Sequence, residues 1–170
     1  MILGMSVATF TAFHVVLSLI GILAGLVALY GMLASKQFDA WTAVFLAFTV
    51  LTSVTGFFFP RDKILPSHVV GVISLIVLAI AIFALYSRHL AGSWRWVYVV
   101  TAVMSLYLNV FVLVVQSFLK LAPLKALAPT QSEPPFVIVQ GVVLVLFIGL
   151  GVWALRAFHP PPDAPAPRAA

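Results

Sequence analysis

The sequence predicts an all-α integral membrane protein, a bundle of five transmembrane helices with a disordered Pro-rich C-terminal tail. Of the 170 residues, 64% are hydrophobic and only 8% are charged, whereas soluble domains are about 45–50% apolar and about 25% charged. Five segments are also long and apolar enough to cross a bilayer, which takes about 20 helical residues. Short polar or proline-containing breaks separate these segments.

The five predicted spans are listed here in chain order and form one transmembrane domain, residues 1–159: about 9–34, 41–59, 66–86, 96–119 and 135–157. Prolines at the edges of the third and fifth spans fit helix starts. Residues 160–170, rich in proline and alanine, cannot form a packed helix, and we expect a disordered tail there.

The first span carries an ionisable residue, His14, in an otherwise apolar run. His14, Ser18, Gly21 and Gly25 recur at spacings of three and four residues, so they share one face of the helix. Small residues on such a face let another helix approach closely. We therefore expect His14 to face protein rather than lipid, and the Gly21–Gly25 motif to pack against a neighbouring helix or another subunit.

Polar side chains on the other spans recur near one end of the bundle, which we call the N face because the first span begins there. Asn109 and Gln116 lie on one face of the fourth span, His68 follows the start of the third, and Gln140 lies about five residues into the fifth. An unsatisfied polar group in hydrocarbon costs several kcal/mol. The sequence therefore predicts a polar pocket near the N face, lined by His14, His68, Gln116 and Gln140.

The loop before the fifth span, "KLAPLKALAPTQSEPPF", begins with a short amphipathic segment and continues into a rigid polar bend. Thr130 and Glu133 have the spacing of a capping box, which would mark a helix start. The alternative is a lid over the N-face pocket that carries Gln131 and Glu133 toward His14 and His68.

Three functions remain open. The first is a structural or assembly subunit, or a small-ligand-binding bundle, in which the polar residues are only the satisfied interior. The second is a membrane redox protein that binds haem b through His14 and His68 as axial ligands, or a quinone through hydrogen bonds. The third is a transporter or sensor of a proton or small solute, which a histidine near neutral pH would suit.

Several chemistries lack support in the sequence. There is no cysteine, which excludes disulfides and thiolate metal sites. No serine-hydrolase, zinc-protease or nucleotide-binding motif is present, so the sequence does not favour an enzyme. The net charge of +5 is spread over several loops, and no nucleic-acid partner is expected. The expected partners are the lipid bilayer and either further copies of the chain or other subunits of a membrane complex.

Two stretches, "TGFFFPRDKILPSHVVGVISL" and "LYLNVFVLVVQSFLKLAPLKALAPTQSEPPF", resemble a group of uncharacterised small multi-spanning bacterial inner-membrane proteins. The resemblance covers most of the chain from the second span to the fifth. It implies a bacterial cytoplasmic-membrane location and carries over no catalytic residue. The uncharged amino terminus and the pair Arg88 and Arg95 favour an N-terminus outside and a C-terminus in the cytoplasm.

Overall fold

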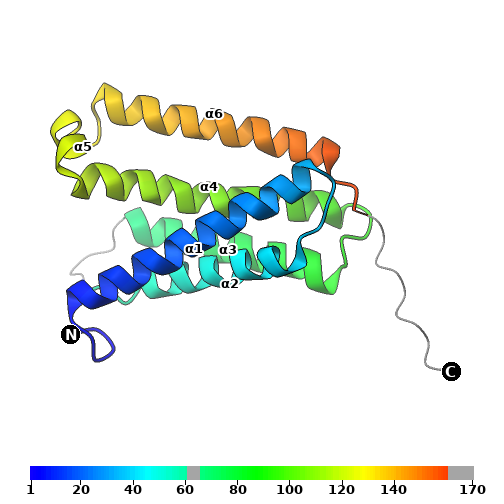
Figure 1. Ribbon diagram of the computed structural model, residues 1–170, viewed down its shortest axis with the longest axis horizontal. Coiled ribbons are helices and arrows are strands. Elements are labelled where there is room, and N and C mark those ends of the chain that lie inside the picture. Colours follow the sequence, from blue (N-terminus) through cyan, green and yellow to red (C-terminus); the bar gives the residue numbers. More distant parts are fainter. Residues whose placement is uncertain (61–65, 161–170) are drawn as a thin grey trace.

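The computed structural model describes residues 1–60 and 66–160 (Figure 1). These residues form seven helical elements, listed in chain order: α1 (Val7–Leu33), α2 (Asp39–Gly56), α3 (Pro66–Ile82), the π-helical turn η1 (Phe83–Ser87), α4 (Trp94–Lys120), α5 (Ala122–Leu127) and α6 (Pro134–Ala157). Five of the helices are long and apolar enough to span a membrane. The predicted all-α bundle is confirmed, while tail residues 161–170 lie outside the described part.

The helix boundaries follow from local chemistry. The Ser6 side chain caps α1 by accepting a hydrogen bond from the Thr9 amide at 3.1 Å. α2 ends at Gly56, earlier than predicted, because the next two amides turn back to Val54 and Thr55. The third span continues from α3 into η1. It ends with a hydrogen bond that the Arg88 amide donates to the Phe83 carbonyl.

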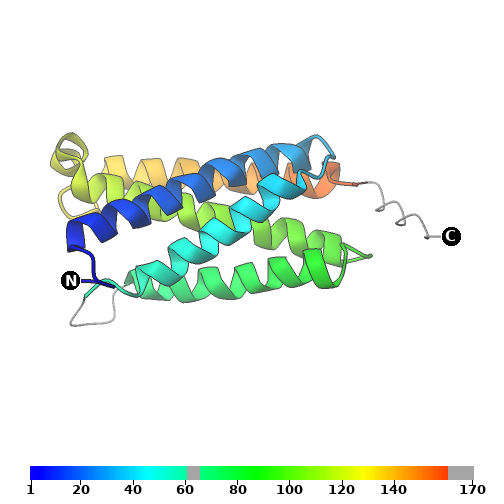
Figure 2. The ribbon, with the colours of Figure 1, turned by 60° about the horizontal axis from the view of Figure 1, so that its bottom comes forward.

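Four of the spanning helices form a ring in which each contacts the next. α1 packs on α2, α2 on α3, α3 on α4, and α4 again on α1. α6 lies outside this ring, along α4, and reaches α1 as well (Figures 1 and 2). In its most apolar stretch only 11% of the α6 residues are buried, against 28–39% in the other spans. The bundle is therefore a four-helix ring with a fifth helix on its outer side.

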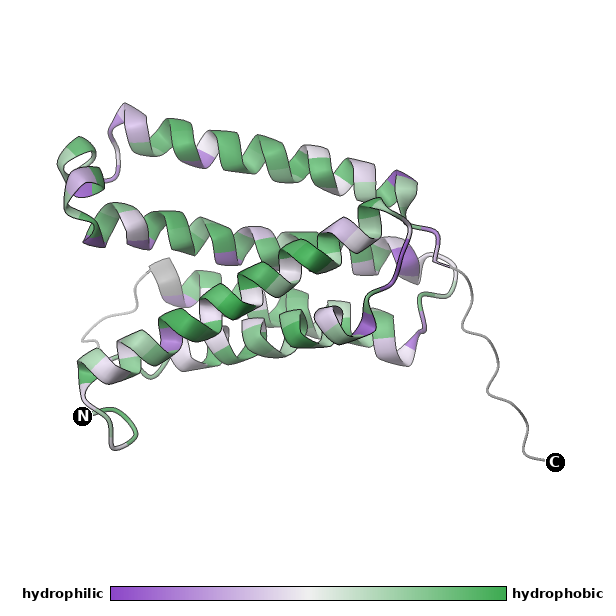
Figure 3. Cartoon of the chain, in the orientation of Figure 1, coloured by the Kyte–Doolittle hydropathy of each residue, from purple (hydrophilic) through white to green (hydrophobic). Residues whose placement is uncertain are grey.

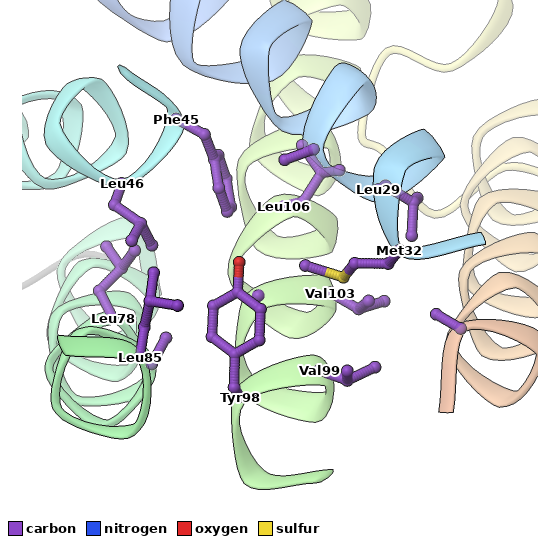
Figure 4. Packing of buried hydrophobic residues seen from close by; sticks show 14 of the residues in the cluster. Leu29, Met32, Phe45, Leu46, Leu78, Leu85, Tyr98, Val99, Val103 and Leu106 are labelled. Atoms are coloured by element: carbon purple, nitrogen blue, oxygen red, sulfur yellow. The ribbon is translucent and has the colours of Figure 1, made fainter. Parts of the chain in front are cut away.

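The half of the ring away from the N face is filled by apolar side chains. Phe45, Leu78 and Leu106 are almost fully buried there, and the Tyr98 ring lies among them (Figure 4). The Tyr98 hydroxyl shares a hydrogen bond with the Thr42 side chain, which satisfies it inside this core. Hydrophobic residues dominate the spans, and hydrophilic residues gather at the two ends with isolated exceptions along the helices (Figure 3).

The small-residue face of α1 packs inside the chain. A Cβ atom at Gly21 would lie 3.1 Å from the Thr49 hydroxyl of α2 and 3.4 Å from the Asn109 amide nitrogen of α4. A Cβ atom at Gly25 would lie 2.6 Å from Leu106 and 2.8 Å from Phe45. The expectation that this motif packs against a helix is confirmed, but its partners are α2 and α4, so it is not available to a second subunit.

Arg95 fixes the opposite end of α6. Its guanidinium donates hydrogen bonds to the carbonyls of Leu155 and Phe158, the last residues around the end of that helix. The Phe158 ring is buried beside Tyr98, with ring centroids 6.1 Å apart. These contacts hold the otherwise exposed α6 against α4.

We predict that Gly25→Ala lowers the free energy of unfolding by about 1–3 kcal/mol, the usual cost of overpacking a filled core. Neither Leu106 nor Phe45 has room to move, since each is 1% exposed. Unfolding in mixed detergent micelles, followed by circular dichroism, measures the change. The matched control is Gly149→Ala on α6, where a Cβ atom meets nothing within 4 Å. Equal stability of the two variants would contradict the packing described.

Candidate functional site

A cavity of about 290 Å³ lies in the N-face half of the four-helix ring. α1, α2, α3 and α4 all contribute to its wall, together with the turn that follows α2. The polar residues of its lining are Thr11, His14, Thr49, Thr52, Ser53, His68, Ser74, Asn109, Gln116 and Lys120. Three of the four residues predicted to line a pocket, His14, His68 and Gln116, therefore meet in one place.

His14 is oriented by a threonine of the neighbouring helix. Its Nδ1 atom lies 2.8 Å from the Thr55 hydroxyl oxygen. That hydroxyl has one hydrogen, which it donates to the Leu51 carbonyl at 2.7 Å. The imidazole is therefore the donor, and the neutral ring carries its hydrogen on Nδ1. The Phe59 ring meets the imidazole edge to face, with centroids 5.2 Å apart.

His68 lies near the start of α3 beside another aromatic ring. The centroids of His68 and Phe57 are 5.8 Å apart, with the rings tilted by 40°. One turn further along, a Cβ atom at Gly71 would lie 3.0 Å from the Phe57 ring. The glycine thus lets Phe57 lie directly on α3. Phe57 and Phe59, two of the three phenylalanines after α2, therefore form an aromatic wall beside His68 and His14.

The deeper end of the cavity holds buried polar atoms without a hydrogen-bond partner. Asn109 is 7% exposed, and its Oδ1 atom accepts a hydrogen bond from the Ser18 hydroxyl at 2.9 Å. Its Nδ2 atom has no partner among the described residues, and neither has the hydroxyl of Thr49, which is 2% exposed. Buried polar groups are normally paired. Among the described residues Gln140 Oε1 is the third such atom, and two of the three therefore belong to residues that line this cavity.

One face of α4 runs the length of the cavity. Asn109, Gln116 and Lys120 all contribute to the lining and recur at spacings of seven and four residues. The eleven helical steps from Asn109 to Lys120 correspond to about 16 Å of helix. The cavity is therefore bordered by an uncharged amide in its depth and by an ammonium group at the N-face end.

Gln140 and Glu133, both candidate ligand-binding residues, do not belong to the described lining of this cavity. Gln140 lies at the right depth, but α6 is outside the ring, and its amide donates to the Phe111 carbonyl of α4 at 3.2 Å. Gln131 donates to the Val115 carbonyl at 2.8 Å rather than reaching a histidine. The proposed lid is instead a strap between α4 and α6.

Glu133 closes its own turn and precedes α6 directly. Its carboxylate accepts hydrogen bonds from the Thr130 hydroxyl at 2.9 Å and from the Thr130 and Ser132 amides at 3.1 Å each. Desolvation raises the pKa of this carboxyl, but the hydrogen bonds from Thr130 and Ser132 outweigh it and lower the pKa below its ordinary value. The capping-box spacing is thus used to close a turn, with Glu133 rather than Thr130 at the helix start.

Sequence reasoning missed the aromatic rings of Phe57 and Phe59 and, on α3, the lining residues other than His68. Phe57 and Phe59 were counted within the second span, and helix termination at Gly56 is what turns them toward the histidines. Ser74 was available as a signal, since His68, Gly71 and Ser74 recur every three residues on α3. The stretch 61–65, whose charged residues adjoin the N face in the sequence, lies outside the described residues.

The cavity is small for haem. Both imidazoles line it, as ligation from two sides would require. Its volume, however, lies at the lower limit of the range of about 300–1,000 Å³ typical of sites for drug-sized ligands, and the porphyrin macrocycle is larger than most such ligands. Within the described ranges no group of three or more His, Cys, Asp and Glu side chains could hold a metal ion, but haem iron needs only two axial ligands, so the argument against haem is the size of the cavity. The residues fit a compact organic molecule better than haem.

Comparisons of the chain with protein-family models, with curated proteins and with solved structures find no match.

We predict that Thr55→Val redistributes the hydrogen of the neutral His14 ring, because the Nδ1 donor loses its acceptor while the side-chain shape is kept. Nitrogen chemical shifts of isotope-labelled histidine, measured by NMR at a pH where the ring is neutral, report the two tautomers. The control is Thr101→Val on α4, whose hydroxyl donates only within its own helix. A His14 spectrum that is the same in wild type and Thr55→Val would contradict the assigned donor.

The Glu133 turn should loosen in acid. Because its pKa is lowered in the folded protein, the carboxylate stabilises the turn at neutral pH, and this contribution is lost as the pH falls through the folded-state pKa. Hydrogen exchange at the Thr130 and Ser132 amides, corrected for intrinsic exchange, should show protection that decreases in this range. Glu133→Gln should abolish the pH dependence. Protection in wild type that stays constant down to strongly acidic pH would contradict the assignment.

Proposed function

We propose that the protein is a membrane-embedded binding protein for a small organic molecule, which occupies the cavity between α1, α2, α3 and α4. The observation that carries this proposal is the pair of buried, unpartnered groups beside the cavity, the Thr49 hydroxyl and the Asn109 Nδ2 atom. Leaving one such group unpaired costs about 1–3 kcal/mol. A guest with hydrogen-bonding atoms would recover that cost.

The rest of the cavity wall also suits an organic guest. Apolar side chains such as Val70, Leu108 and Val112 alternate with the polar residues, and Phe57 and Phe59 add aromatic surface. A mostly apolar wall with a few placed polar groups is the usual composition of a small-molecule site. A purely structural bundle gives no reason for an interior space at this position, whereas the small-residue face of α1 already accounts for helix packing.

The setting we propose is a bacterial cytoplasmic membrane with the C-terminus inside, based on the sequence resemblance and on Arg88 and Arg95. The N-face cavity would then lie toward the outer side of that membrane. A quinone-linked redox role is the second candidate, favoured by the aromatic wall beside both imidazoles. It differs from simple binding in requiring that a quinone be among the ligands.

The test uses one variant that fills the cavity and one that does not. Ser53 lines the cavity, and its hydroxyl donates to the Thr49 carbonyl of its own helix at 2.9 Å. Ser53→Leu therefore adds volume inside the cavity without removing a hydrogen bond to another helix. Ser117 bonds to its own helix in the same way, at 2.8 Å to the Leu113 carbonyl, but is not among the described lining residues. Ser117→Leu is the matched control.

Thermal unfolding is measured in phosphatidylcholine nanodiscs with a medium-chain carboxylate, its amide, its amine and a tailless quinone. We expect at least one compound to stabilise wild type and Ser117→Leu, by about 2.7 kcal/mol at a hundred times its Kd, and to leave Ser53→Leu unchanged. Stabilisation by the quinone alone would favour the redox candidate. If no compound distinguishes wild type from Ser53→Leu, the binding function is refuted.

A further inference from the structure

We infer that the cavity binds an elongated, compact carboxylate whose far end carries an oxygen atom able to form hydrogen bonds. This inference rests on the proposed binding function and names its ligand class. It comes from the two ends of the cavity, which differ in chemistry. One end carries a positive charge at the membrane surface, and the other carries uncharged polar groups in the interior.

The N-face end favours an anion. Lys120, the last residue of α4, contributes to the lining, and its side chain ends in an ammonium group. No Asp or Glu is found among the described lining residues, so none of them neutralises this charge from within the wall. A hydrogen bond between an ammonium group and a carboxylate is about twice as strong as one between neutral groups. This end therefore discriminates in favour of a negatively charged head.

The deep end favours a neutral oxygen. The unpartnered Nδ2 atom of Asn109 is a donor and needs an acceptor. The Thr49 hydroxyl beside it can both donate and accept. Both atoms lie within 3.4 Å of the position that a Cβ atom at Gly21 would take, so they are neighbours at this end of the cavity. A hydroxyl or carbonyl oxygen satisfies this end, whereas a terminal methyl group leaves both protein groups unpaired.

The separation of the two ends sets the length of the guest. Asn109 and Lys120 are about 16 Å apart along α4, and the two side chains cover part of that distance. A cavity of about 290 Å³ that extends over this length has a narrow cross-section. Between the ends lie Val112, Val70 and the Phe57 ring, which suit a hydrocarbon chain. A medium-chain acid with an oxygen at its far end, such as ω-hydroxyoctanoate, meets all of these conditions.

The experiment compares three probes on the full chain in phosphatidylcholine nanodiscs by titration calorimetry: ω-hydroxyoctanoate, octanoate and ω-hydroxyoctanamide. We expect ω-hydroxyoctanoate to bind most tightly. The amide should bind about tenfold more weakly because it lacks the negative charge. Octanoate should be weaker by about fivefold because it leaves the deep groups unpaired. Ser53→Leu should abolish binding of all three.

Two variants assign the ends separately. Lys120→Gln should weaken the binding of the two carboxylates by about tenfold and leave the binding of the amide unchanged. Lys125→Gln on the exposed α5 is its control. Thr49→Val should weaken ω-hydroxyoctanoate but not octanoate, because the lost hydroxyl serves only the far oxygen. Thr49 has no described partner to strand, so this variant should fold normally.

The outcomes separate the two proposals. If the amide binds as well as the acid, or if Lys120→Gln and Lys125→Gln are alike, the carboxylate class is refuted while cavity binding stands, provided Ser53→Leu still abolishes it. If Thr49→Val weakens octanoate and ω-hydroxyoctanoate equally, the far-oxygen assignment is refuted. If none of the probes binds wild type more tightly than Ser53→Leu, this inference fails, and the panel of neutral, basic and quinone compounds then decides the broader function.

Discussion

The structure depends on one constraint, the free-energy cost of leaving a polar group in the membrane interior without a hydrogen-bond partner. An unpaired amide or hydroxyl in hydrocarbon costs several kcal/mol, whereas an interhelical hydrogen bond in a membrane protein contributes about 0.6 kcal/mol on average. The penalty therefore outweighs the gain. Bonds such as Ser18 to Asn109 and His14 to Thr55 decide which way the helices face more than how stable they are.

Close approach of the helices makes these bonds possible. At Gly21 and Gly25 the backbone of α1 lies against side chains of α2 and α4, and any larger residue would hold the helices apart. The same approach leaves the Thr49 hydroxyl and the Asn109 Nδ2 atom buried beside a cavity with no partner among the described residues. Nearer the N face, Phe57 and Phe59 lie between the helix ends and the two histidines. Tight packing in one half and inserted aromatic rings in the other thus accompany an interior space at the N-face end.

Much of this arrangement could be predicted from the sequence because a bilayer restricts the possibilities. Apolar length fixed the five spans to within a few residues, and the spacing of His14, Ser18, Gly21 and Gly25 gave the inward face of α1 correctly. Depth along each span could also be estimated, which brought His14, His68 and Gln116 to the same cavity. These predictions use only the geometry of a single helix.

The errors concern the order of the helices around the bundle, which single-helix geometry does not contain. Gln140 was placed at the correct depth, but nothing in α6 alone indicates that it packs outside the ring and bonds to α4. A lid carrying Glu133 was one of two alternatives, because its turn could point either way, and its hydrogen bonds to Thr130 and Ser132 hold the carboxylate in its own loop. Phe57 and Phe59 were missed because their role follows from where α2 ends.

Thiol cross-linking between α1 and α4 tests the inward orientation most directly, since the chain has no cysteine of its own. Ser18→Cys combined with Asn109→Cys should cross-link rapidly with a short bifunctional reagent, and Leu19→Cys, which turns to the exposed side, should not cross-link with Asn109→Cys. Efficient cross-linking through residue 19 and none through residue 18 would contradict the inward-facing polar interior.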